Sequence, residues 1–201
     1  MGDQTAYQPL TRRDVIDVLL YRSGIAVSSL VAAVFAPYVI VTLRSGSAIS
    51  HVAASAALAL LYVSIAASVL KIHLYVGSLH RFLKKLYFMS LVCLVSLTFV
   101  GGGNPAGAIF YKPLYGLLLL PLGGCLGFIT AKEAFCFRLG EGYLLAVIMP
   151  LHILAASLGI VSPRGAAAAL GMIAALLIFF TVRKTSMPLH YDIGDKSAYR
   201  P

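Results

Sequence analysis

The chain has 201 residues, of which 60% are hydrophobic and 11% are charged, and its mean hydropathy is +0.90. Soluble domains are about half apolar and about a quarter charged, so this composition excludes an ordinary water-soluble fold. The formal net charge of +9 comes from basic residues between and after apolar runs, without a basic stripe or nucleic-acid-binding module. We therefore predict a membrane protein without a nucleic-acid partner.

Six apolar runs are long enough to cross a lipid bilayer as helices, since each span needs roughly 20 mostly apolar residues. In chain order they cover 24–43, 52–70, 86–104, 113–130, 143–161 and 165–182. The third run is the least regular, because its strongly apolar part would make a helix of only about 22 Å unless it extends back through Phe82. The sequence predicts an all-α polytopic bundle of six transmembrane helices.

The segment before the first run has a helix signal of its own. The sequence Thr11-Arg12-Arg13-Asp14 resembles a capping box with Asp in place of Glu. The apolar residues that follow, within 15–20, are typical of a short amphipathic helix. Two interpretations stay open: this helix lies in the membrane interface, or it lengthens the first span.

The distribution of Lys and Arg predicts the orientation of the chain. Thirteen of the 16 basic residues fall in the N-terminal segment, the second and fourth loops and the C-terminal tail. In a six-span chain these four segments share one side, and only Arg44, Lys112 and Arg164 fall on the other. The positive-inside rule therefore makes both termini cytoplasmic, with 1–23 as N-terminal segment, 24–182 as transmembrane domain and 183–201 as tail.

Small residues indicate where helices approach one another closely. Gly123 and Gly127 form a GxxxG motif in the fourth run, and Ala167, Gly171 and Ala175 form a small face on the sixth. Such faces mediate either dimerisation or packing within one chain. With six spans in one chain, we favour packing within the monomer.

Ionisable residues are scarce in the predicted spans. All seven acidic residues lie outside them, which argues against a proton-coupled pump and against an acidic intramembrane hydrolase. The one ionisable residue deep in a span is His152. It is either an axial ligand to a chlorophyll magnesium or a haem iron, or a neutral imidazole bonded to Ser157, Thr98 or a backbone carbonyl.

Two histidines precede the third run. His73 and His80 are seven residues apart and would share one face of a helix, close in sequence to Lys84 and Lys85. A basic surface of this kind binds anionic lipid head groups, or it is simply a solvated loop. We name these four residues as a candidate head-group site.

Charged and aromatic side chains are densest between the fourth and fifth runs, over 130–142. Arg and aromatic residues are enriched where proteins dock, so we predict that this loop and the tail dock a partner. The predicted docking residues are Lys132, Glu133, Phe135, Phe137, Arg138, Glu141, Tyr191 and Tyr199. Cys136 has no histidine nearby in sequence to act as its base, and we predict that the chain is not an enzyme.

The same loop carries a resemblance to a known family. The stretch Lys132-Glu133-Ala134-Phe135-Cys136-Phe137-Arg138, the following Glu141-Gly142 and the six-span plan resemble a family of uncharacterised integral membrane proteins best known in cyanobacteria. The resemblance covers nearly the whole chain. That family has no assigned reaction, so the resemblance implies a setting, a thylakoid or cytoplasmic membrane, where many small helical proteins are accessory subunits or assembly factors.

Two functions follow from these observations. The leading hypothesis is a non-enzymatic accessory or assembly subunit of a larger membrane complex, photosynthetic by the resemblance, in contact with pigment or lipid. The alternative is a small-solute transporter or channel built on proline-broken spans at Pro37, Pro121 and Pro150. A polar cavity at mid-membrane would favour transport.

Overall fold

The computed structural model describes residues 11–193, and the statements below concern that part of the chain. Its helices, in chain order, are α1 (Arg12–Arg44), α2 (His51–Lys71), α3 (Gly77–Val100), α4 (Pro105–Tyr111), the 3₁₀ helix η1 (Pro113–Leu119), α5 (Leu120–Phe137), α6 (Gly140–Ser157), α7 (Pro163–Thr185) and the 3₁₀ helix η2 (Leu189–Asp192). Six segments are long and apolar enough to cross a membrane, with η1 and α5 together forming one of them. The predicted all-α fold with six spans is confirmed.

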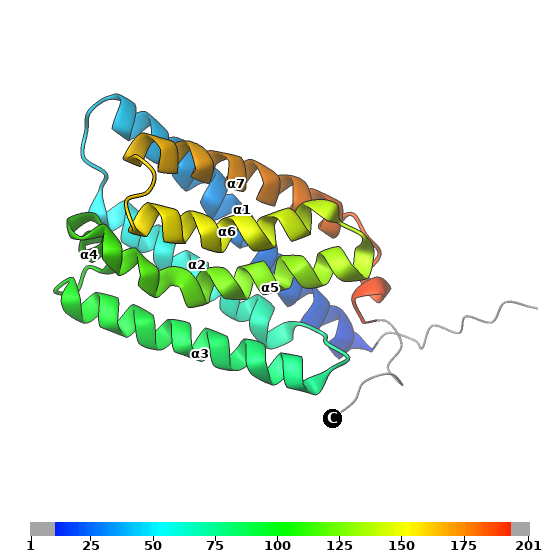
Figure 1. Cartoon of the computed structure of the whole chain (residues 1–201). Coiled ribbons are helices and arrows are strands. Elements are labelled where there is room, and N and C mark those ends of the chain that lie inside the picture. Colours follow the sequence, from blue (N-terminus) through cyan, green and yellow to red (C-terminus); the bar gives the residue numbers. More distant parts are fainter. Residues whose placement is uncertain (1–10, 194–201) are drawn as a thin grey trace, which may run out of the picture.

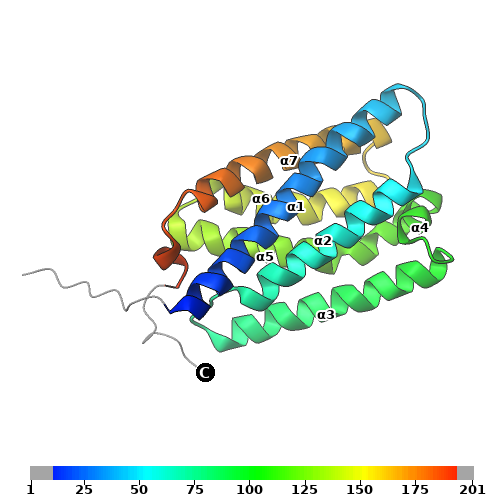
Figure 2. The same ribbon diagram turned by 180° about the vertical axis from the view of Figure 1, so that it is seen from behind.

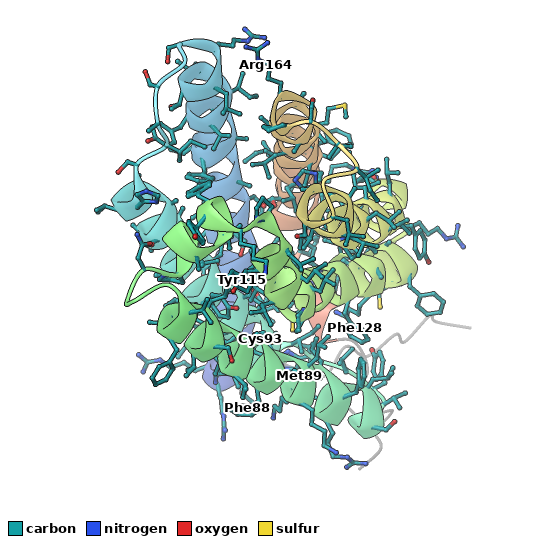
Figure 3. All side chains as sticks on the ribbon, turned by 60° about the vertical axis from the view of Figure 1, so that its left-hand side comes forward. Phe88, Met89, Cys93, Tyr115, Phe128 and Arg164 are labelled. Atoms are coloured by element: carbon teal, nitrogen blue, oxygen red, sulfur yellow. The ribbon has the colours of Figure 1, made fainter. Side chains whose placement is uncertain are left out.

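The long helices lie side by side, with the connections at the two ends of the bundle (Figure 1). Helix α1 packs between α2 and α7 and crosses the bundle obliquely, whereas α5 packs between α3 and α6 (Figure 2). Helix α3 lies at the edge, where Phe88 and Met89 are exposed (Figure 3), as expected of a helix that faces lipid. The buried core draws on every span, for example through Ile25, Ile65, Leu83, Ile129, Leu145 and Phe180.

Helix α1 begins where the sequence predicted a helix start and continues without a break. The Thr11 hydroxyl accepts a hydrogen bond from the Asp14 amide at 3.2 Å, and the Asp14 carboxylate accepts one from the Thr11 amide at 2.8 Å. This is the predicted capping box. The helix then runs for 33 residues, so the amphipathic stretch lengthens the first helix rather than forming a separate one.

Several helix bounds differ from the apolar runs. Helix α3 starts at Gly77 and has 24 residues, about 36 Å, which removes the apparent shortness of the third span. The short helix α4 was not predicted; Pro105 stands in its first turn, and the Asn104 side chain caps it by accepting from the Gly107 amide. Pro121 lies in the first turn of α5, so only Pro37 and Pro150 lie inside their helices.

The GxxxG motif of α5 packs inside the chain, as predicted. A Cβ atom at Gly123 would lie 2.5 Å from Cδ1 of Ile153, and one at Gly127 would lie 3.2 Å from the Ala146 carbonyl oxygen. Both neighbours belong to α6. The absence of side chains at these two positions therefore lets α5 and α6 approach closely.

Both ends of the described chain lie at the same end of the bundle. Arg22, near the start of α1, bonds Asp192 of η2 across 170 residues of sequence. This is the arrangement that an even number of spans requires. That this end is cytoplasmic stays a prediction from the basic residues; below, it is called the termini end.

Candidate functional site: a buried ion network and an apolar cavity

Five charged side chains and one tyrosine meet inside the termini end of the bundle. They come from α1, α5, α7 and η2, and are Tyr21, Arg22, Lys132, Glu133, Lys184 and Asp192. Three of the charges are positive and two are negative. We call this set the ion network.

Glu133 is the centre of the ion network, and its side chain is 0% exposed. Its carboxylate accepts hydrogen bonds from the Tyr21 hydroxyl at 2.5 Å and from Lys132 Nζ at 2.7 Å, and it pairs with Lys184. The residue points inward because it continues the buried face of α5 through Leu126, Ile129 and Thr130 at helical spacing. A buried carboxylate is stable only with such partners.

Lys184 links the two acidic groups of the ion network. Its ammonium group, also 0% exposed, pairs with both Glu133 and Asp192 and lies 3.7 Å from the centre of the Phe137 ring. An ammonium over an aromatic face gains a further favourable interaction. The Lys184 side chain therefore joins α7 to both α5 and η2.

Arg22 anchors the chain that follows α7. Its Nε donates to Asp192 at 2.6 Å, and its other nitrogens donate to the carbonyls of Thr185 (3.3 Å), Met187 (2.5 Å) and Pro188 (3.0 Å). The last carbonyls of a helix have no partner within it, so a guanidinium group is a suitable donor there. The ion network thus ties residues 185–192 across the end of the bundle.

Some of the predicted docking residues are engaged within the chain, and others are exposed. Lys132 and Glu133 lie on α5, not in a surface loop, because this helix continues seven residues beyond the predicted end of the span; both face the interior. Phe137 is half-buried beside the lysines, and Glu141 pairs with Arg183 at 2.7 Å. The exposed residues are Phe135, Arg138 and Tyr191, and Tyr199 lies outside the described residues.

Sequence reasoning missed the ion network for an identifiable reason. The predicted spans stopped at the first charged residue, which placed Glu133 and Lys184 outside the membrane helices. Within the described residues both are buried and belong to α5 and α7. The helical spacing of Glu133 behind Leu126 and Ile129 was the one signal that could have placed it inside.

A second feature is an apolar cavity of about 330 Å³ between the helices, on the side where α4 lies. Residues of α1, α2, α4, η1, α5, α6 and α7 line it, and all of them are apolar apart from Ser28 and His152. The Ser28 hydroxyl is already engaged, with the Gly24 carbonyl at 2.9 Å and the Ser64 hydroxyl at 2.7 Å. His152 is therefore the polar group that the wall offers to a ligand.

The His152 imidazole has no hydrogen-bond partner among residues 11–193. Thr98, one partner considered from the sequence, donates to the Leu94 carbonyl at 2.8 Å. Ser157, the other, lies against Gly116 of η1. In the same part of the chain no group of three or more His, Cys, Asp or Glu residues is placed to hold a metal ion.

His73 and His80 do not share a helix face, because α2 ends at Lys71 and His73 lies in the connection before α3, which contains His80. Both nevertheless line a second, polar cavity at the termini end. Lys84 is half-buried one turn beyond His80, Lys85 is exposed, and neither lines this cavity. Burial lowers the pKa of the His73 imidazole, with a nearby Lys132 acting in the same direction and Asp17 against it. This imidazole is therefore neutral at pH 7.

Comparison with known proteins supplies the family. The family model described as "Uncharacterized integral membrane protein (DUF2301)" matches residues 67–200. A protein from Haemophilus influenzae, described as "Uncharacterized protein", is 28% identical over 203 residues, which cover 100% of this chain and 99% of the relative. No solved structure matches the chain. The match includes the 132–142 stretch on which the resemblance depended, and the chain belongs to this family of uncharacterised integral membrane proteins, DUF2301.

Proposed function

We propose that this protein is a non-enzymatic membrane subunit that holds a mainly hydrocarbon ligand in the apolar cavity, with His152 bonded to the ligand's polar group. The observation that carries the proposal is an imidazole that has no hydrogen-bond partner in the described part of the chain and lies on a wall that is apolar apart from the engaged Ser28. The volume of about 330 Å³ falls at the lower end of the range of ligand sites, about 300–1,000 Å³.

The chemistry of the wall defines the class of ligand. The His152 imidazole is half-buried, and a ligand oxygen that meets it would form a hydrogen bond worth about 1 kcal/mol. The remaining wall favours hydrocarbon over polar groups, because a polar group placed against it would lose its hydrogen bonds. The ligand is therefore a lipid-like molecule with one carbonyl or hydroxyl group, such as an isoprenoid or acyl compound.

The apolar wall also bears on the alternative of a small-solute transporter or channel. Pro37 and Pro150 lie inside α1 and α6, two of the helices that line the cavity. Prolines inside helices allow kinks, and helices interrupted in this way are a feature of transporters. A polar solute, however, would lose its hydration in the cavity and find only His152 and an already bonded Ser28. The cavity suits a lipid-like ligand better.

Cavity-filling substitutions test this proposal. Ala57 lines the cavity from α2, whereas its neighbour Ala56 is exposed on the outside of the same helix. We expect Ala57→Phe to reduce a co-purifying ligand at least tenfold, because the ring occupies the space, and Ala56→Phe to leave it unchanged. His152→Leu removes one hydrogen bond and should weaken retention roughly fivefold.

The measurement is mass spectrometry of the organic extract from protein purified in a mild detergent, together with its absorption spectrum. If the wild-type protein and Ala57→Phe carry the same compounds in the same amounts, the proposal is wrong. A tetrapyrrole spectrum lost in His152→Leu would instead support the chlorophyll or haem interpretation of this histidine.

The proposed partner surface is the exposed remainder of the predicted docking residues. Phe135 is 79% exposed at the end of α5, and Arg138 and Tyr191 are exposed at the same end of the bundle. We propose that the complex lies in a thylakoid or a cytoplasmic membrane. In an organism that has thylakoids, we propose that it is a photosynthetic complex. The full-length relative in Haemophilus influenzae supports a role that is not confined to cyanobacteria.

Docking is tested by the size of the assembly in a gentle detergent extract. We expect the wild-type protein to migrate on native gels within a larger complex, and the double variant Phe135→Ser/Arg138→Glu to migrate alone, because it removes the aromatic contact and reverses the charge. Arg164→Glu, at the opposite end of the bundle (Figure 3), is the matched charge reversal and should behave as wild type. A wild-type protein that already runs alone contradicts the partner.

A further inference from the structure

The polar cavity at the termini end has a volume of about 280 Å³ and lies apart from the apolar cavity. It is formed where the start of α1, the end of α2 and the start of α3 meet. Its lining residues are Arg13, Asp17, Leu70, Lys71, Ile72, His73, Leu74 and His80. Three different segments of the chain therefore contribute a cationic or imidazole side chain to one small space.

The charges in this cavity do not cancel. Lys71 Nζ pairs with the Asp17 carboxylate at 2.7 Å, which neutralises one positive charge. Arg13 has no acidic partner among the described residues and leaves the cavity with one net positive charge while both imidazoles are neutral. A guanidinium group presents its N–H groups in a planar fork that matches the oxygens of a phosphate.

His80 adds a hydrogen-bonding atom that the chain itself does not use. Its Nε2 is buried and has no hydrogen-bond partner within residues 11–193. His80 stands in the first turn of α3, a helix whose N-cap, Val76, provides no side-chain cap. The positive end of the α3 dipole lies at this turn and also favours a nearby anion.

We propose that this cavity binds a phosphate group, held by the guanidinium of Arg13 and the imidazole of His80, with Lys71 adding positive charge. The group has two sources: the head group of an anionic phospholipid or a soluble phosphate. Leu70, which lines the cavity, is 51% exposed, and an apolar side chain at the edge of a cationic cavity is suited to the boundary between head groups and acyl chains. This site is independent of the lipid-like ligand near His152.

The experiment uses the full chain purified in an uncharged detergent and two probes. One probe is inorganic phosphate at millimolar concentration, compared with chloride at equal ionic strength. The other is a bilayer nanodisc of phosphatidylcholine with or without phosphatidylglycerol. The midpoint of thermal unfolding is measured, because a ligand that binds the folded state raises it.

We expect at least one probe to raise the midpoint and Arg13→Gln to weaken that probe's apparent affinity about fivefold, the effect of one cationic side chain near a membrane surface. Arg12→Gln removes an equal charge from a neighbouring exposed residue that does not line the cavity, and should have no such effect. Arg13→Lys should recover part of the affinity. His80→Gln should weaken binding without changing the net charge at neutral pH.

The outcomes separate the two sources. An effect of both probes shows a phosphate site open to soluble anions, and an effect of the lipid alone shows a head-group site; either supports the proposal. No effect of either probe overturns it. Equal losses in Arg12→Gln and Arg13→Gln also overturn it, because they would reflect general surface charge and not this cavity.

Discussion

Replacement of Glu133 by leucine is expected to lower the free energy of unfolding by about 3–5 kcal/mol, as found when one partner of a buried ion pair is removed. The change deprives Tyr21, Lys132 and Lys184 of their shared acceptor at once. The two lysines would then lie near each other in the interior, with Asp192 as the remaining acidic member of the ion network. Water cannot screen this charge, because the Glu133 and Lys184 side chains are fully buried.

This effect is measured by thermal unfolding of the purified protein in detergent, with the loss of the monodisperse species as the signal. Glu141→Leu is the matched control, since Glu141 also pairs with a basic side chain, but this side chain, that of Arg183, is 43% exposed. A pair of this kind is worth about 1 kcal/mol or less. Equal losses for the two leucine variants would show that the ion network does not hold the bundle together.

A second substitution sharpens the same test. Lys184→Leu combined with Glu133→Leu should cost less than the sum of the two single changes, because each single change leaves an opposite charge buried without one of its partners. The coupling between two residues in one network is typically about 0.5–3 kcal/mol. Additive losses would show that the Glu133–Lys184 pair is not energetically coupled.

Replacement of Gly24 by leucine is expected to separate α1 from α2 and to cost about 3 kcal/mol, the upper part of the usual range for overpacking. A Cβ atom at Gly24 would lie 2.3 Å from Oγ of Ser68 and 2.4 Å from the Ser64 carbonyl oxygen. The backbone carbonyl cannot move aside without displacing α2. The displacement would also stretch the hydrogen bond from Ser68 to the Tyr21 carbonyl, now 3.0 Å.

Gly171→Leu is the matched control for this prediction. The small face of α7 suggested close packing at Gly171, but a Cβ atom there would meet only the end of the Ile40 side chain, at 3.2 Å. A flexible side chain can give way, so this variant should unfold close to the wild-type temperature. A Gly24→Leu protein as stable as Gly171→Leu would contradict the close contact between α1 and α2.

The sequence by itself determined the number of spans, and with it that the first span begins, and the last span ends, at the same end of the bundle. The thickness of the bilayer imposes a minimum length on each apolar run, and no water is present to satisfy a broken backbone. The start of α1 was equally predictable, because a capping box joins residues only three apart. The 132–142 stretch indicated the family, which the match over 67–200 confirmed.

Only the tertiary structure decided which polar groups are paired and which are left to bind something else. Glu133 and Lys184 looked like surface residues because hydropathy treats each charge alone, whereas their burial depends on partners from other helices. Tyr21 and Glu133 are 112 residues apart, and no local pattern records that contact. His152 is the converse case: its place within an apolar run was evident from the sequence, but the cavity that it lines is formed by helices that are far apart in the chain. Pairing and cavities are properties of the packed helices, since both depend on distances between residues that the chain keeps far apart in sequence.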